Sequence, residues 1–99
     1  MPKLVLWSPL ALNDISSILQ YLQDNWDSPV VVKFIDITND LIEQIAINPR
    51  QFPVIHKSKR IRKCVITKHN TIFYRERKDQ IDILRIYDTR QDPKKLKFL

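Results

Sequence analysis

The sequence contains no glycine and only one cysteine among its 99 residues. Walker loops and dinucleotide-binding fingerprints need glycine where the backbone approaches a phosphate, so both are excluded. Cys64 cannot form an intramolecular disulfide, and no basic start followed by an apolar run indicates a signal peptide. No apolar stretch approaches the roughly 20 residues that cross a bilayer. We therefore expect a protein of the reducing cytoplasm that does not associate with a membrane.

The residues that would build a metal site are scattered. His56, Cys64 and His69 lack the short spacing at which zinc ligands recur. Cys64 lies within an apolar segment, where a small buried side chain is the ordinary outcome and nothing activates a thiolate. We expect no metal ion, no other cofactor and no cysteine nucleophile.

Size and charge give the first positive information. At 43% hydrophobic residues, the chain is large enough to bury a core, and we expect residues 1–99 to form one domain without a linker. Residues 1–49 hold two lysines and six acids, whereas residues 50–99 hold 15 basic and five acidic residues. The second half therefore favours a nucleic acid or an acidic protein as partner, with a merely solubilising surface as the alternative.

The first quarter of the chain predicts a strand and a helix. Residues 3–7 are short, apolar and β-prone. Ser8 and Pro9 then begin a helix, because serine accepts hydrogen bonds from free amides and proline lacks an amide of its own. The apolar stripe of this helix consists of Leu12, Ile15, Ile18, Leu19, Leu22 and Trp26. We expect Trp26 to lie in the core, together with Trp7.

A second helix follows after a short turn. Ser28-Pro29 repeats the start signal, and Asn48-Pro49 forbids continuation. The stripe of this helix consists of Val30, Phe34, Ile37, Leu41 and Ile45. Two helices joined by so short a turn form an antiparallel hairpin.

The second half predicts a sheet. Residues 51–60 show neither the helical nor the strand period of apolar residues, so we predict a connection there. The basic run of this connection can contact phosphate. Three β-prone segments then form an antiparallel meander, at residues 61–67, 71–76 and 81–87. Because glycine is absent, a left-handed turn position falls to Asn70, Asp79 or a neighbour. The tail from residue 88 either docks as a short segment or trails.

These elements predict an α+β fold. An N-terminal strand, a helical hairpin and a three-stranded antiparallel meander follow one another, with the hairpin packed on one face of the sheet. We expect the other face and the C-terminal region to form the positively charged surface.

Basic and aromatic residues alternate along the predicted sheet. The set comprises Arg62, Lys63, Lys68, His69, Arg75, Arg85 and Arg90, interleaved with Phe73, Tyr74 and Tyr87. Cleavage of RNA without a metal needs a base, an acid and cations that stabilise the phosphorane. His69 is the titrating candidate because the ordinary pKa of histidine lies near neutrality, although a histidine in a hairpin turn is usually just solvated.

The order of elements and several local stretches resemble the RelE/ParE superfamily of toxins over nearly the whole chain. The stretches are Trp7 to Ala11 with Asp14-Ile15, Ile72 to Arg75, and Ile83 to Arg90. The resemblance implies the toxin of a type II toxin–antitoxin pair, as in plasmid stabilisation. Such toxins arrest growth by cutting messenger RNA in the ribosomal A site or by poisoning DNA gyrase. A cognate antitoxin silences them, and we expect its acidic or amphipathic segment to cover the basic surface.

The resemblance also bears on the choice between the two targets. Arg62 and Arg90 match basic positions of the nuclease members. Cys64 stands where a lysine is often found, Thr71 where an arginine opens the third strand, and Asp88 where a histidine is common. The incomplete set favours a ParE-like gyrase inhibitor, whose target contacts would be Lys63, Lys68, Arg75, Arg85 and Tyr87. Two alternatives stay open: a ribosome-dependent endoribonuclease with Arg62, Arg90 and His69 as catalytic residues, and a non-toxic nucleic-acid-binding relative.

Overall fold

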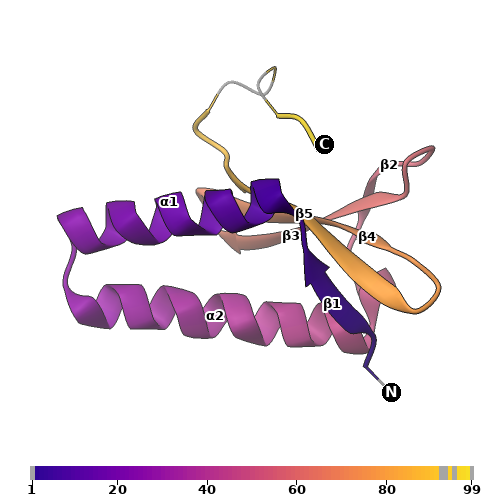
Figure 1. Ribbon diagram of the computed structural model, residues 1–99, viewed down its shortest axis with the longest axis horizontal. Helices are drawn as coiled ribbons and strands as arrows, with labels where there is room; N and C mark the ends of the chain where they lie inside the picture. Colours follow the sequence, from indigo (N-terminus) through magenta and orange to yellow (C-terminus); the bar gives the residue numbers. More distant parts are fainter. Residues whose placement is uncertain (1, 92–93, 95, 99) are drawn as a thin grey trace.

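The computed structural model describes residues 2–91, 94 and 96–98. A helical hairpin lies against one face of a five-stranded sheet (Figure 1). In chain order the elements are β1 (Leu4–Trp7), α1 (Pro9–Asn25), α2 (Ser28–Ile47), a short 3-10 helix (Pro49–Gln51), β2 (Val54–His56), β3 (Ile61–Thr67), β4 (Asn70–Glu76) and β5 (Gln80–Asp88). The predicted strand, helical hairpin and meander are confirmed.

The sheet is mixed, in the order β1-β5-β4-β3-β2. Strands β2 to β5 are antiparallel to their neighbours, whereas β1 lies parallel to β5, from Leu4 opposite Gln80 to Trp7 opposite Ile83. Two parallel strands need a long connection between them, and the helical hairpin forms the first part of the connection from β1 to β5. Strand β1 thus closes the edge that the meander leaves open.

Strand β2 was not predicted, because residues 51–60 were expected to be only a connection. The strand has three residues, and its register with β3 shifts between Val54 and His56. Val54 and Ile55 are both exposed, so no alternation of buried and exposed positions exists that a sequence pattern could reveal.

Both helix starts lie at the predicted Ser-Pro pairs, but only one serine caps a helix. The Ser8 hydroxyl accepts a hydrogen bond from the Ala11 amide (3.0 Å) and donates one to the Leu84 carbonyl (2.8 Å), which ties α1 to β5. The cap of α2 is Asp27, one residue before the predicted serine, and its side chain makes no capping hydrogen bond.

The main core lies between the hairpin and the sheet. Its buried residues are Ala11, Ile45, Cys64, Ile72, Tyr74, Ile81, Ile83 and Ile86. Trp7 packs against it, as predicted. The Tyr74 hydroxyl donates a hydrogen bond to the Pro49 carbonyl (2.6 Å), which satisfies the polar end of a fully buried side chain.

The outer face of the sheet, opposite the helices, is less charged than expected. Ile61, Phe73, Leu84 and Tyr87 form a second buried cluster there, and Leu96 and Phe98 pack against it. The Phe73 and Phe98 rings meet edge to face, with centroids 5.4 Å apart. The described part of the C-terminal tail therefore docks, because it covers apolar side chains that would otherwise face water.

The prediction that Trp26 lies in the core is wrong, since its side chain is 58% exposed. The helical hairpin projects past the end of the sheet (Figure 1), so the apolar stripes near the α1–α2 turn have no strand beneath them. Leu12 and Val30 of the predicted stripes are exposed as well.

The left-handed backbone position is also not where it was expected. Among the described residues, the non-glycine residue with positive φ is Arg60 (φ 57°), in the β2–β3 turn, and not Asn70 or Asp79. The two-residue turn between β3 and β4 needs no such position here.

Candidate functional site

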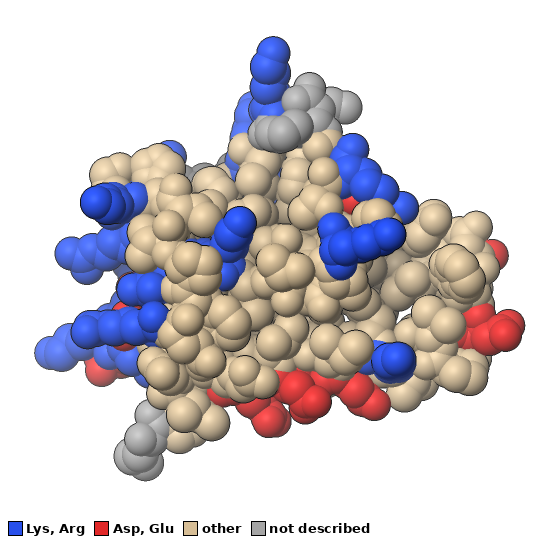
Figure 2. Space-filling model, turned by 180° about the vertical axis from the view of Figure 1, so that it is seen from behind, with Lys and Arg blue, Asp and Glu red and all other residues tan. Residues whose placement is uncertain are grey.

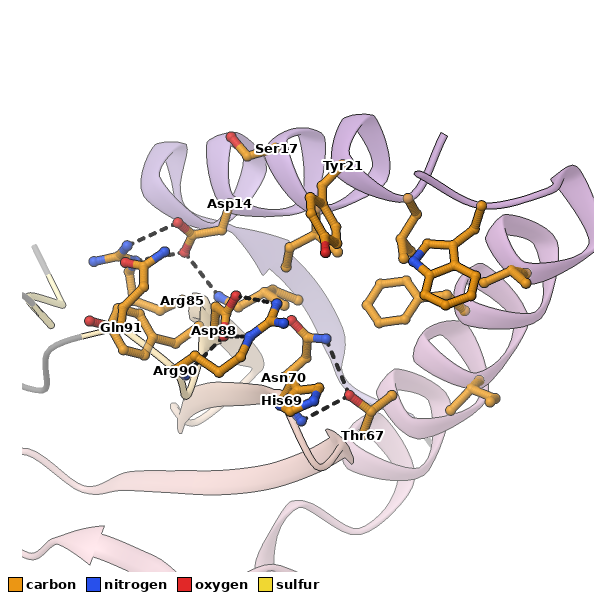
Figure 3. Close-up of a pocket in the computed structure, with 18 of the residues that line it drawn as sticks. Asp14, Ser17, Tyr21, Thr67, His69, Asn70, Arg85, Asp88, Arg90 and Gln91 are labelled. Carbon is orange, nitrogen blue, oxygen red and sulfur yellow. Dashed lines mark hydrogen bonds and ion pairs between the residues drawn. The ribbon is translucent and has the colours of Figure 1, made fainter. Parts of the chain in front are cut away.

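A groove of about 950 Å³ lies between the outer halves of α1 and α2 and the sheet end formed by the β3–β4 turn and the end of β5 (Figure 3). We call it the hairpin groove. It exists because the hairpin is longer than the sheet that it covers. One wall is apolar, and the opposite side carries charged and hydrogen-bonding groups.

Exposed apolar side chains line the helical wall of the hairpin groove. Tyr21 (49% exposed), Trp26 (58%) and Val30 (40%) surround the more buried Phe34 and Ile37. Large apolar side chains gathered at an open groove are typical of a protein contact surface. Sequence periodicity could not distinguish them from core residues, because the period is the same on both parts of the helix.

The sheet side of the groove is dominated by an ion pair between Asp88 and Arg90. Arg90 Nε and Nη2 donate to the two carboxylate oxygens of Asp88 (3.0 and 2.8 Å), and the Arg90 amide donates to the same group (2.9 Å). These hydrogen bonds lower the pKa of Asp88 and raise that of Arg90. The Arg90 guanidinium also lies over the Tyr21 ring, 5.9 Å from its centroid. Arg90 is thus held in place but electrically paired.

His69 lies beside this pair, in the β3–β4 turn (Figure 3). Its amide donates a hydrogen bond to the Thr67 hydroxyl oxygen (3.2 Å), and its carbonyl accepts one from the Thr89 amide (2.8 Å). The histidine is half-buried. The structure therefore brings together two of the three predicted catalytic residues, His69 and Arg90.

Arg62, the third predicted catalytic residue, lies elsewhere. It begins β3, and its Nη1 donates to the Phe52 carbonyl (2.6 Å) and to the Arg50 carbonyl (3.3 Å). His69 is seven residues further along the chain, which at strand rise is about 20 Å away. Arg62 therefore holds the segment before β2 and does not reach the groove.

Arg85, predicted to contact the target, is bound inside the protein. Its Nε and Nη2 donate to the two oxygens of Asp14 (2.6 and 2.9 Å), and these hydrogen bonds raise the pKa of Arg85. Asp14 also accepts the Ile86 amide (3.1 Å), while Arg85 Nη1 donates to the Lys97 carbonyl (2.6 Å). The side chains of the pair are only 14% and 13% exposed. No local pattern predicts that Asp14 pairs with a residue 71 positions away.

The other predicted contact residues do not share one surface. Lys68 is exposed in the β3–β4 turn, and Lys63 is exposed on the outer face of β3. Arg75 is half-buried and pairs with Asp82 (3.5 Å). Tyr87 is buried in the outer cluster, with part of its surface lining the hairpin groove.

The sequence of this chain matches a known protein family over most of its length. The family described as the ParE toxin of type II toxin-antitoxin system, parDE, matches residues 5–93. The chain belongs to this family. Since such a toxin is one half of a two-component system, membership implies an antitoxin as partner.

Solved structures agree on the fold of this ParE-family chain. It is similar to a structure of the chromosomal ParDE system from P. aeruginosa, with a TM-score of 0.73 at 15% identity, over 87% of this chain and 95% of that one. A copper-bound mutant toxin from Helicobacter pylori is similar with a TM-score of 0.62 at 18% identity, over 91% of this chain and 97% of that one. No curated protein matches in sequence. At these identities the likeness shows the α+β fold.

The side chains able to bind metals lie apart in the described part of this ParE-family chain. No three histidine, cysteine, aspartate or glutamate side chains gather there as a metal site would require. Cys64 is buried, as predicted, and burial raises the pKa of its thiol to about 11, so the thiol stays protonated at neutral pH. No helix within the described ranges is long and apolar enough to span a bilayer.

Proposed function

We propose that this ParE-family chain arrests bacterial growth by binding and inhibiting DNA gyrase, without itself breaking a bond in RNA. The observation that carries the proposal is the separation of the candidate catalytic residues. A nuclease needs its base, its acid and its cations within hydrogen-bond reach of one phosphate. Arg62 lies at one end of β3, while His69 and Arg90 lie at the other.

The electrostatics of the hairpin groove support the same proposal. A cation that stabilises a phosphorane must present uncompensated positive charge. Asp88, which stands where nuclease members of the superfamily commonly have a histidine, neutralises Arg90 through two hydrogen bonds. The same substitution removes one group able to transfer a proton near neutral pH. The groove is thus better suited to binding than to acid–base chemistry.

The antitoxin is the occupant that we propose for the hairpin groove. An amphipathic segment would place its apolar side chains on Tyr21, Trp26 and Phe34. Its acidic side chains would lie near Lys33, which also lines the groove. Trp26→Ser should weaken the affinity for the cognate antitoxin about 30-fold, a loss typical of an interfacial tryptophan. Leu12→Ser is the matched control, because Leu12 belongs to the same helical hairpin, is similarly exposed and does not line the groove.

Gyrase inhibition is tested directly with purified components. Relaxed plasmid, gyrase and ATP are incubated with increasing amounts of the chain, and the supercoiled product is measured on a gel. The proposal expects concentration-dependent loss of supercoiling, which equimolar antitoxin reverses. Undiminished supercoiling, with growth arrest on expression in cells, would contradict gyrase as the target; normal growth would favour the non-toxic relative. The proposed target also requires the chain to act in the cytoplasm.

A further inference from the structure

Positive charge gathers at the end of the sheet away from the hairpin groove. Two hairpin turns lie there, residues 57–60 between β2 and β3 and residues 77–79 between β4 and β5. We call them the basic turns. Figure 2 shows lysines and arginines clustered at this end, while acidic side chains follow the helices. Strands β3 and β4 are neighbours, so the two turns lie about 10 Å apart at the usual strand spacing.

Most of the cations in the basic turns have no acidic partner among the described residues. Lys57, Lys59, Arg60 and Lys78 are exposed, and in the described part of the chain their side chains make no hydrogen bond or ion pair. Two nearby acids are already occupied, because Glu76 binds Lys3 and Arg50, and Asp82 binds Arg75 and Arg77. The exposed Asp79 is the acid of the β4–β5 turn itself. Four positive charges, set against the one negative charge of Asp79, therefore remain available to a polyanion.

Hydrogen bonds within the β2–β3 turn hold its backbone, which carries the exposed cations. His56 Nδ1 accepts the Lys59 amide (3.3 Å), and the Arg60 amide donates to the Lys57 carbonyl (3.1 Å). Arg60 adopts the left-handed conformation, which is unfavourable for a side chain with a Cβ and for which glycine is the usual residue. This conformation costs energy that glycine would avoid, while the exposed guanidinium presents a positive charge at the turn.

The absence of stacking groups decides which polyanion fits. Proteins that read single-stranded nucleic acids stack bases on exposed aromatic rings. In the described residues, the markedly exposed aromatic side chains are Tyr21 and Trp26, both on the hairpin and away from the basic turns. Duplex DNA presents mainly phosphates, about one charge for every 1.7 Å of axis, and needs only cations.

We propose that the basic turns bind the phosphate backbone of duplex DNA. This inference rests on the proposed function, because it lets the toxin contact the DNA on which gyrase acts. The helices would face away from the duplex, since residues 9–47 carry one lysine against six acids. The hairpin groove would stay open on the opposite side.

Binding is measured with the full chain and a fluorescent 25-base-pair duplex of arbitrary sequence, by anisotropy between 50 and 200 mM salt. Four phosphate contacts predict a slope of about −3 to −4 for the logarithm of the binding constant against that of salt. Lys57→Gln, Lys59→Gln and Lys78→Gln should each reduce the slope by about one. Lys97→Gln, which removes an exposed lysine outside the turns, should not change it.

Arg60→Gly separates the charge from the fold. Glycine relieves the left-handed strain, so the unfolding midpoint should stay the same or rise while the slope falls by about one. A purely structural role for Arg60 predicts unchanged DNA binding, which would contradict the proposal.

The outcomes distinguish this inference from the proposed function. No binding at 50 mM salt, or an equal loss with Lys97→Gln, would overturn DNA contact. Tighter binding of poly-glutamate than of the duplex, compared at equal charge and salt, would overturn it in favour of an acidic protein. Gyrase is absent from the binding assay, so these failures leave gyrase inhibition standing, and intact DNA binding without inhibition would contradict the proposed function alone.

Discussion

Asp14 and Arg85 form a two-point ion pair that fastens the helical hairpin to the sheet beyond the end of β1. Strand β1 pairs only with Gln80 to Ile83, and the rest of that edge of β5 is bound by α1 through Ser8 and Asp14. The Asp14 carboxylate satisfies both the Arg85 guanidinium and the Ile86 amide. One side chain on α1 therefore continues the hydrogen bonding that a longer strand would provide.

Asp14→Ala should lower the free energy of unfolding by about 3 kcal/mol, because Nε and Nη2 of a largely buried guanidinium and one backbone amide lose their acceptor. Urea denaturation at pH 7 measures the loss. Asp24→Ala on the same helix is the control, since Asp24 is exposed and should change stability by less than about 0.5 kcal/mol. Equal effects of the two variants would show that the pair contributes nothing specific.

Arg62→Met should destabilise the fold by about 2 kcal/mol, because the guanidinium donates to two carbonyls before β2 and the bond to Phe52 is short. Toxicity should fall only as far as the folded fraction falls. Lys63→Met, on the exposed side of the same strand, is the matched control for stability. A fully stable Arg62→Met protein without toxicity would contradict this and show that Arg62 contacts the target or its substrate directly.

The sequence predicted the elements well and the roles of the charged residues poorly, for a physical reason. Periodicity and Ser-Pro pairs are local, so the hairpin and strands β3 to β5 could be located. Whether a cation is free depends on acids far away in the sequence, such as Asp14 for Arg85, and no local pattern reveals them. The prediction for Trp26 was wrong for a similar reason, because the length of the sheet decides which turns of a helix are covered, and the apolar stripe of the helix does not reveal that length.

Stability should also fall in acid through Glu76. Burial alone would raise the pKa of Glu76, but hydrogen bonds from Lys3 and Arg50 outweigh it and lower the pKa. A lowered folded-state pKa stabilises the protein above the ordinary glutamate value of about 4.3, and this contribution is lost as the pH falls through the folded-state value. Glu76→Gln should therefore cost up to about 1 kcal/mol at pH 7 and much less near pH 3. Urea denaturation at both values checks this, and a pH-independent cost would contradict it.

His69→Gln distinguishes binding from proton transfer at the hairpin groove. A general acid or base contributes about 100-fold or more to a rate, so a nuclease would lose nearly all its activity. If the chain acts by binding, the concentration of the chain that half-inhibits supercoiling should change less than about threefold. Asn70→Ala in the same turn controls for local disturbance, since Asn70 donates to Thr67 and cannot transfer a proton near neutral pH.

The central claim, that the toxin acts without cutting RNA, is tested most directly in cell-free translation. Purified chain is added to a translating extract, and new 5′ ends are mapped on the messenger, with a parallel reaction that lacks ribosomes. The account predicts an intact messenger in both reactions at concentrations that abolish gyrase supercoiling. Codon-spaced cuts that require ribosomes, and that vanish in His69→Gln, would contradict it and establish an endoribonuclease.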